Sequence, residues 1–241
     1  MRGIILSGGS GTRLRPLTKI TSKQLLPIYN RPMIYYPLNT LINAGIKEIL
    51  IIVAPERAGD YLNLLGSGKQ FGVKFTYEIQ DKPEGLAQAF IIGENFIDNE
   101  DVAMILGDNI FEDDFSEEIK SFKSGAKIFA KHVPDPERFG VVKFDENFKA
   151  KKIVEKPQEY LSNYAVTGLY VYDQRVVKIA KEIKPSARGE LEITDLNNWY
   201  LERGELEVAM VKGEWLDAGT FDSLLKAQSF AKEKLDKKML I

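Results

Sequence analysis

The chain has 241 residues, of which 44% are hydrophobic and 28% are charged, and its formal net charge is -2. A chain of this length buries an ample core without cross-links, and its composition is that of a globular protein. The near-neutral charge gives no reason to expect nucleic acid or an anionic membrane surface as a partner, so we expect neither. The absence of cysteine excludes disulfides, thiolate metal sites and a cysteine nucleophile.

No apolar run approaches the roughly 18 residues that a transmembrane helix requires. The first residues lead directly into a strand, without the basic segment and small-residue cleavage site of a signal peptide. We therefore expect a cytoplasmic protein.

Apolar runs of strand length alternate with helical patterns through the first half of the chain. The patterns predict strands and, between them, helices: strands at Ile4–Leu6, Glu48–Val53, Val73–Gln80 and Val102–Leu106, and helices at Met33–Ala44, Arg57–Leu65 and Glu84–Phe96. This alternation predicts an α/β fold with a Rossmann-like, mostly parallel sheet flanked by helices. Ligands of such sheets bind beyond the carboxyl ends of the strands, where we place Leu6–Arg13, Gln80–Gly85 and Gly107–Asn109.

The rhythm changes after residue 115. Strands then follow one another with few helices between them, and the predicted elements are a helix at Phe115–Lys123, strands at Lys127–Val133, Gly140–Phe144, Lys151–Glu155 and Tyr164–Tyr172, helices at Arg175–Ile183 and Glu192–Glu202, a strand at Leu206–Val211 and a helix at Thr220–Lys234. Consecutive strands predict antiparallel hairpins on or beside the parallel sheet. We expect one domain over 1–241 with two halves, 1–114 and 115–241.

A glycine-rich stretch, G-G-S-G-T-R-L-R-P, follows the first strand. Gly8, Gly9 and Gly11 would expose successive backbone N–H groups, and Arg13 and Lys23 add positive charge, which together suit a polyphosphate. The stretch has no G-x-x-x-x-G-K-[ST] motif, and Leu14 stands where G-x-G-x-x-G needs its third glycine. It is either a different phosphate-binding device or a structural turn with solvated basic residues.

Two aspartates follow predicted strands. Asp108 comes directly after a buried strand and Gly107, where a carboxylate either holds Mg²⁺ or caps a turn. Asp217, in E-W-L-D-A-G-T, precedes a helix, where an aspartate is more often a cap or a loop residue than a metal ligand. The two would share one site only if the fold brings them together.

Other polar residues have a chemical and a simpler structural explanation. Lys156 and Glu155 end a strand before a proline, and Arg188 precedes a helix, so each is either a ligand for phosphate or hydroxyl groups or a solvated residue. Gln24 and Gln80 carry amides that both donate and accept, as reading a nucleobase requires. The chain has one histidine and neither a Ser-His-Asp set nor a two-His metal spacing, which argues against triad hydrolases and zinc enzymes.

Taken together, these stretches resemble the sugar-phosphate nucleotidylyltransferases, most closely the branch that acts on glucose 1-phosphate with a thymidine nucleotide. The matching blocks occur in the family's order along nearly the whole chain: L-S-G-G-S-G-T-R-L-R-P-L-T at 6–18, K-Q-L-L-P-I-Y-N-R-P-M-I-Y-Y-P-L at 23–38, P-E-G-L-A-Q-A-F at 83–90, L-G-D-N at 106–109, R-F-G-V-V at 138–142, V-E-K-P at 154–157, S-N-Y-A-V-T-G-L-Y-V-Y-D at 162–173, R-G-E-L-E-I-T-D-L-N at 188–197 and W-L-D-A-G-T at 215–220.

The resemblance implies Mg²⁺-dependent transfer of a thymidylyl group from dTTP to α-D-glucose 1-phosphate, giving dTDP-glucose and pyrophosphate, a step of dTDP-rhamnose biosynthesis. It implies that the first half binds the nucleotide through Gly8, Gly9, Gly11, Thr12, Arg13, Lys23, Gln24, Gln80, Gly85 and Asp108. It implies that the sugar phosphate is bound by Asn109 of the first half and, from the second half, by Gly140, Glu155, Lys156, Val166 and Arg188. Asp108 and Asp217 would bind Mg²⁺, and the implied catalytic residues are Arg13, Lys23 and Lys156.

Two other functions stay open at this point. The first is a uridylyltransferase that uses UTP, which differs from dTTP by one methyl and one hydroxyl group. The thymidylyl branch is favoured over it by the blocks P-E-G-L-A-Q-A and S-N-Y-A-V-T-G-L-Y. A non-catalytic nucleotide sensor would be expected to lose Asp108, Asp217 or Lys156, and all three are present.

Longer members of the family continue into a C-terminal helical region with subunit contacts and a regulatory nucleotide site. The chain stops at Ile241, so we expect a short form without that site, and a homo-oligomer, either a dimer or a tetramer.

Overall fold

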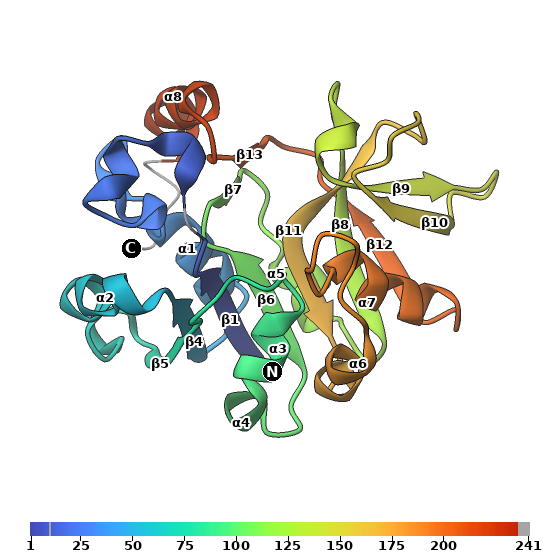
Figure 1. The fold of residues 1–241 in the computed structure, drawn as a ribbon, viewed down its shortest axis with the longest axis horizontal. Helices are drawn as coiled ribbons and strands as arrows, with labels where there is room; N and C mark the ends of the chain where they lie inside the picture. Colours follow the sequence, from blue (N-terminus) through green and yellow to red (C-terminus); the bar gives the residue numbers. More distant parts are fainter. Residues whose placement is uncertain (10, 236–241) are drawn as a thin grey trace.

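The computed structural model describes residues 1–9 and 11–235, and a nine-stranded sheet forms its centre (Figure 1). Four strands from the first half are parallel and lie in the order β6-β1-β4-β5: β1 (Arg2–Ser7), β4 (Glu48–Val53), β5 (Lys74–Ile79) and β6 (Val102–Leu106). Strand order reverses between β1 and β6, and that is where doubly wound sheets bind ligands.

The second half extends the same sheet. β11 (Tyr164–Tyr172) runs antiparallel to β6 and joins it to the remaining strands, which are β8 (Ala126–His132), β9 (Gly140–Phe144), β10 (Ala150–Glu155) and β12 (Leu206–Met210). β12 pairs with β8 in the parallel sense, so the second half is not built from antiparallel hairpins alone.

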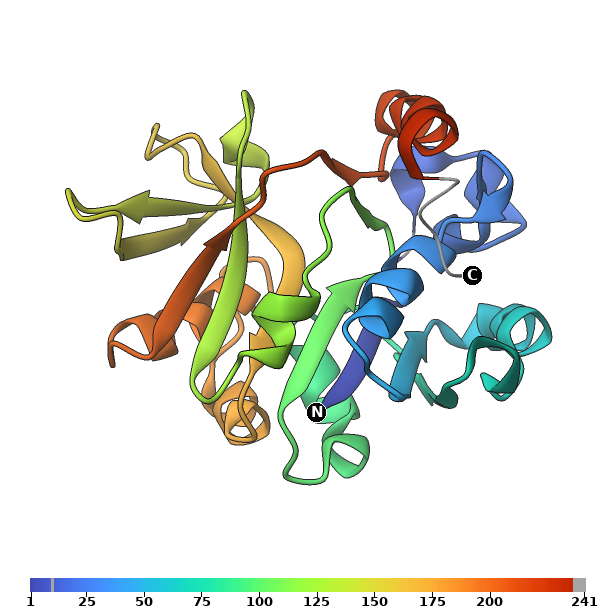
Figure 2. The same cartoon turned by 180° about the vertical axis from the view of Figure 1, so that it is seen from behind.

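Helices cover both faces of the sheet (Figures 1 and 2). One core cluster contains Ile5 and packs beneath α1 (Tyr35–Asn43), α2 (Ala58–Leu65) and α5 (Ser116–Lys120). The opposite cluster contains Ile4 and packs beneath α3 (Gln88–Ile92), α4 (Glu94–Ile97), α6 (Val176–Glu182) and α7 (Ile193–Leu201). Neighbours on β1 therefore face opposite cores, as strand geometry requires, and its apolar run is buried on both sides.

A third core lies beside the carboxyl ends of β1 and β6. It joins α8 (Phe221–Phe230) to two small sheets, β2 (Pro27–Ile28) with β3 (Arg31–Pro32) and β7 (Asn109–Phe111) with β13 (Trp215–Asp217). Thr220 caps α8 through a reciprocal pair of hydrogen bonds with Ser223. A π-helical turn, Ala231–Leu235, continues α8.

The structure confirms the predicted α/β class and all the predicted strands, with differences of one or two residues at their ends. The helix expected over Glu84–Phe96 is instead two short helices on either side of Gly93. A β-carbon at Gly93 would lie 3.0 Å from Leu50 Cδ2, so the chain approaches the sheet closely there. The pairs β2–β3 and β7–β13 were not predicted, because two- and three-residue strands leave no periodicity. Within the described residues, the helices are all too short or too polar to cross a membrane.

Candidate active site

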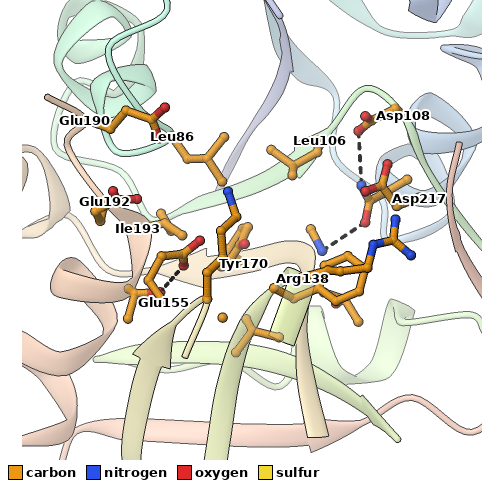
Figure 3. A pocket seen from close by; sticks show the side chains of 18 of the residues that line it. Leu86, Leu106, Asp108, Arg138, Glu155, Tyr170, Glu190, Glu192, Ile193 and Asp217 are labelled. Carbon is orange, nitrogen blue, oxygen red and sulfur yellow. Dashed lines mark hydrogen bonds between the residues drawn. The ribbon is translucent and has the colours of Figure 1, made fainter. Parts of the chain in front are cut away.

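Two adjoining cavities open at the carboxyl ends of β1 and β6. The smaller, of about 200 Å³, is lined by Leu6, Gly9, Lys23, Gln24, Gln80, Pro83, Gly85, Leu86, Leu106, Asp108 and Glu190. The larger, of about 470 Å³ (Figure 3), is lined by eight further residues of the predicted set, which are Arg13, Asn109, Gly140, Glu155, Lys156, Val166, Arg188 and Asp217. Both cavities are lined by Leu86, Leu106, Asp108 and Glu190. Asp108 is thus the predicted residue common to both, and we call them the nucleotide-side and sugar-side cavities after the ligands that the sequence resemblance implies for their residues.

The sugar-side cavity lies beside β11, between the strands β6 and β9, which pair with different parts of β11. β8 pairs with β11 along one edge, from Tyr164 to Tyr172, while β6 and β9 share the other edge at different positions. Between them Gly168 has no strand neighbour on that edge, and its N–H donates to Asn109 Oδ1 at 2.9 Å. The gap between β6 and β9 is therefore a cleft with a polar floor.

The glycine-rich loop after β1 borders this region. A β-carbon on Gly8 would lie 2.0 Å from Gln80 Oε1, so only glycine fits beside that amide. Gly11 has a positive φ of 59°, and its carbonyl accepts a hydrogen bond from Thr18 Oγ1 at 2.7 Å. Gly8, Gly11 and the exposed Thr12 support the loop but do not line either cavity, whereas Gly9 does.

The fold brings Asp108 and Asp217 together. β13 pairs with β7 so that Asp217 lies opposite Asn109, and Ala218 N–H donates to the carbonyl of Asp108 at 3.0 Å. This contact joins residues 108 and 217, which sequence spacing alone could not do. Figure 3 shows both carboxyl groups at one end of the sugar-side cavity.

Positive charge balances the two carboxylates. Lys23 forms a buried ion pair with Asp108. Burial is the largest single influence on both groups and favours their neutral forms, but the charge of the partner and the hydrogen bond between them outweigh it. The pKa of Lys23 is therefore raised and the pKa of Asp108 lowered.

Asp217 carries the opposite shift. Burial, and then the nearby Asp108 carboxylate, raise the pKa of Asp217 to about 6, while Lys23, Arg13 and Arg138 oppose the shift. Its Oδ1 atom is buried and, within the described residues, has no hydrogen-bond partner. An unpartnered carboxylate oxygen beside a second carboxylate suits a divalent cation, and Mg²⁺ commonly takes one or two carboxylates with the remaining ligands from phosphate and water.

Glu155 is held at the far end of the cleft, at the end of β10. Thr194 Oγ1, at the start of α7, donates to Glu155 Oε2 at 2.6 Å. A β-carbon on Gly140 would lie 3.1 Å from Thr194 Oγ1 and 3.3 Å from Glu155 Oε2, and Val166 lines the cavity beside them. An oriented carboxylate over a bare glycine suits recognition of sugar hydroxyl groups.

Lys156 and Arg188 supply positive charge to this side. Lys156 has a positive φ of 42° directly after β10, and it lines the cavity while staying exposed. The Arg188 guanidinium contacts three carboxylates, those of Glu192 at 2.8 Å, Glu190 at 3.3 Å and Glu155 at 3.6 Å. Arg188 is therefore already paired, and Lys156 is the more available cation for a phosphate.

Two predicted residues have roles that the sequence did not indicate. Asn109 is 2% exposed, and its amide accepts from Trp215 Nε1 at 2.6 Å and donates to Asp108 Oδ1 at 3.1 Å. It therefore orients Asp108 as well as lining the cavity. Gly85 has a φ of 108°, and its β-carbon would lie 2.3 Å from the Leu191 carbonyl oxygen, so this loop packs directly on the loop before α7.

Several residues that line the sugar-side cavity were missed from the sequence. Arg138 and Trp215 begin the blocks R-F-G-V-V and W-L-D-A-G-T, which is the one signal that would have pointed to them. The others are Leu86, Leu106, Phe139, Thr167, Gly168, Tyr170, Glu190, Glu192, Ile193 and Thr194.

Residues 2–234 match the model of the nucleotidyl transferase family. Curated relatives include a glucose-1-phosphate thymidylyltransferase of Neisseria meningitidis, 57% identical over 95% of this chain and 82% of the relative. Another, of the same description, comes from Mycolicibacterium smegmatis and is 54% identical over 96% of this chain and 82% of the relative.

Solved structures give the same picture. One from Bacillus anthracis, assigned as a glucose-1-phosphate thymidylyltransferase and determined with sucrose, has a TM-score of 0.92 and 51% identity, covering 97% of this chain and 96% of that one. A UDP-glucose pyrophosphorylase bound to UDP-glucose has a TM-score of 0.85 at 26% identity, covering 97% of this chain and 98% of that one.

Proposed function

The chain belongs to the nucleotidyl transferase family, and from that premise we propose that it is an enzyme that transfers a thymidylyl group from dTTP to α-D-glucose 1-phosphate, releasing pyrophosphate. The observation that carries the proposal is the pair of cavities that meet at Asp108, one bordered by two buried amides and the other by an oriented carboxylate and free basic charge. The reacting groups of two substrates would meet at that junction.

The nucleotide occupies the nucleotide-side cavity in this proposal. Gln24, Gln80 and Gly85 surround the base, and Gly9 and the loop that Gly8, Gly11 and Thr12 support hold the triphosphate with Lys23 and Arg13. Arg13 lies beside Asp217, since a β-carbon on Gly219 would be 2.9 Å from both Arg13 Nη2 and Asp217 Oδ1. That position suits stabilisation of the departing pyrophosphate.

The sugar phosphate occupies the sugar-side cavity. The sugar is bordered by Asn109, Gly140, Glu155 and Val166. Its phosphate is held by Lys156, and also by Arg188 once the phosphate replaces one of the carboxylates that pair with Arg188. An oxygen of this phosphate attacks the α-phosphorus of dTTP in line as the bond to the β-phosphate oxygen breaks. That oxygen is already ionised near neutral pH, so the site needs no strong general base, and catalysis rests on alignment and charge neutralisation.

Nucleotidyl transferases generally use a divalent metal. For this chain we propose Mg²⁺, held by Asp108 and Asp217, and supported by the unpartnered Asp217 oxygen. A bound Mg²⁺ supplies positive charge that draws the α-phosphate and the incoming phosphate oxygen together.

We further propose that the enzyme works as one domain in the cytoplasm, with 1–114 binding the nucleotide and 115–241 the sugar phosphate. Exposed Phe221 and Leu225 on α8 support a homo-oligomer, a dimer or a tetramer. Light scattering on the purified chain distinguishes these from a monomer.

A pyrophosphate-release assay tests the function. Purified chain, Mg²⁺ and glucose 1-phosphate are combined separately with dTTP, UTP, CTP, ATP and GTP. We expect dTTP to give the highest kcat/KM. Preferred turnover of UTP would indicate a uridylyltransferase, whose relative here is only 26% identical, and no turnover with any nucleotide would indicate a sensor.

A further inference from the structure

Gln88, the first residue of α3, forms hydrogen bonds with two other side chains, those of Gln80 and Glu84. Its Oε1 accepts hydrogen bonds from Glu84 N–H at 3.1 Å and from Gln80 Nε2 at 2.7 Å. Its Nε2 donates to Glu84 Oε2 at 2.9 Å. Gln88 itself does not line the nucleotide-side cavity, whereas Gln80 does.

These contacts determine which way each amide faces. A carboxylate only accepts hydrogen bonds, so the NH₂ end of Gln88 must be the end that faces Glu84. The carbonyl end of Gln88 then meets Gln80, and Gln80 must offer its own NH₂ group there. The carbonyl oxygen of Gln80 is consequently the end that is left for a ligand.

The position of that oxygen agrees with this assignment. Gln80 is 3% exposed, and its Oε1 lies beside Gly8 in the glycine-rich loop, next to Gly9, which lines the nucleotide-side cavity with Gln80. A second amide in the same cavity, that of Gln24, is oriented the other way. Gln24 Oε1 accepts from Ser22 Oγ at 2.6 Å and from the Tyr61 hydroxyl at 3.2 Å, which leaves its NH₂ group as a donor.

The Tyr61 hydroxyl keeps its proton throughout the neutral range, because burial raises the pKa of Tyr61 to about 12. The cavity therefore presents an acceptor on Gln80, whose orientation Gln88 fixes, and a donor on Gln24. A thymine or uracil ring presents the matching pattern, a ring N–H between two carbonyl oxygens. Cytosine presents an unprotonated ring nitrogen at that place, and two acceptors would then face each other at Gln80.

We infer that Gln88 is a positioning residue that sets base selectivity: it holds Gln80 with its oxygen toward the ligand, so that the site accepts a pyrimidine with a ring N–H and rejects cytosine. The inference rests on the proposed function for the location of the base. It assigns a role to the glutamine of the block P-E-G-L-A-Q-A.

The test is the Gln88→Lys variant. A lysine only donates, so it would attract the oxygen of Gln80 and turn the NH₂ group of Gln80 toward the ligand. We expect the ratio of kcat/KM for dTTP to that for dCTP to fall about 10- to 100-fold. The added charge affects both triphosphates alike and cancels in the ratio. Gln70→Lys is the matched control, because Gln70 is exposed, donates to the Leu64 carbonyl and lines neither cavity, and its ratio should stay at the wild-type value.

A double variant provides a rescue. In Glu84→Gln with Gln88→Glu, the donor and acceptor exchange places between residues 84 and 88, and position 88 still accepts from Gln80. We expect this variant to restore the ratio to within about threefold of wild type. Failure of the double variant to exceed Gln88→Lys would overturn the inference.

The same ratio is measured as equilibrium affinity for dTTP and dCTP by calorimetry, without glucose 1-phosphate. If wild type binds dTTP in preference to dCTP but does not turn it over, the proposed function fails, while a reduced ratio in Gln88→Lys still supports the inference. A wild-type ratio near 1, or a Gln88→Lys ratio within twofold of wild type, would overturn the inference. If circular dichroism shows that Gln88→Lys is unfolded, Gln88→Met, which is similar in length and lacks the acceptor, carries the same expectation and the same criterion.

Discussion

The groups that line the nucleotide-side cavity come from loops that follow neighbouring parallel strands. The groups that line the sugar-side cavity come from separate segments that lie around β11, where β6 and β9 pair with different parts of that strand. The parallel half places Lys23, Asp108 and Gln80 around one cavity at the carboxyl ends of β1, β6 and β5, and Lys23 pairs with Asp108 there. The sugar side instead depends on groups outside the parallel strands, such as Thr194 at the start of α7, which donates to Glu155 at the end of β10.

The difference shows two ways of preparing a site for anions. The nucleotide side keeps its charges balanced in a buried ion pair and orients its neutral amides through neighbouring side chains. The sugar side leaves Lys156 exposed and surrounds Arg188 with carboxylates. Changes on one side should therefore alter the kinetics of one substrate, except at the junction, where Asp108 serves both.

The largest effect is expected at that junction. Asp108→Asn removes a carboxylate from the proposed metal pair and leaves Lys23 without its buried partner, so kcat should fall about 10³-fold. Steady-state pyrophosphate release measures this. Asp222→Asn, an exposed aspartate of α8, is the control and should match wild type. A kcat for Asp108→Asn within tenfold of wild type would contradict a shared role for this residue.

Arg13→Ala should have the next largest effect. Its guanidinium lies by Asp217, where the proposed mechanism places the departing pyrophosphate, and loss of one such donor lowers kcat roughly 10²-fold. Arg15→Ala removes an exposed cation two residues away that lines neither cavity, and it serves as the control in the same assay. If Arg13→Ala stays within a factor of two of wild type, that role is wrong.

Thr194→Val should affect the sugar side alone. It removes the hydrogen bond that orients Glu155, so the KM for glucose 1-phosphate should rise about 3- to 10-fold while the KM for dTTP stays constant. Thr76→Val on β5, away from both cavities, is the control. An equal rise in both KM values would mean that the two sides are not separable.

The smallest effect on catalysis is expected from Asp173→Asn, which lies at the end of β11 outside both cavities. Burial opposes the charge of Asp173, but hydrogen bonds from Arg175, Gly125 N–H and Tyr200 lower its pKa overall. A lowered folded-state pKa stabilises the fold above the unfolded-state value and loses that contribution as pH falls through the folded value.

Asp173→Asn should therefore reduce the free energy of unfolding at pH 7 by about 1 to 3 kcal/mol, and the difference from wild type should shrink below pH 4. Urea titrations at pH 7 and pH 3 measure it, with kcat at pH 7 as the check on catalysis. A difference that grows on acidification would show that the carboxylate does not stabilise the fold in this way.

Sequence patterns predicted the long strands of both halves, and the elements that they missed are the short strands β2, β3, β7 and β13 and the break in the helix at Gly93. A continuous apolar run that glycine and proline bound, such as 48–53, predicts a buried strand. The pairing of β7 with β13, which brings Asp217 to Asp108, depends on three-residue strands more than 100 residues apart, and no local pattern encodes it. The same reason explains why Arg138 and Thr194 were missed, since their importance comes only from the side chains that the fold places beside them.

Two glycine substitutions test the division between the two sides most directly. Gly8→Ala would force Gln80 away from the nucleotide-side cavity, and Gly140→Ala would press on Thr194 and Glu155 in the sugar-side cavity. With both substrates varied in steady-state assays, Gly8→Ala should raise the KM for dTTP roughly 10-fold or more and leave the KM for glucose 1-phosphate unchanged. Gly140→Ala should do the reverse. If either variant raises both KM values equally, or if the pattern is exchanged, the assignment of the two cavities is wrong.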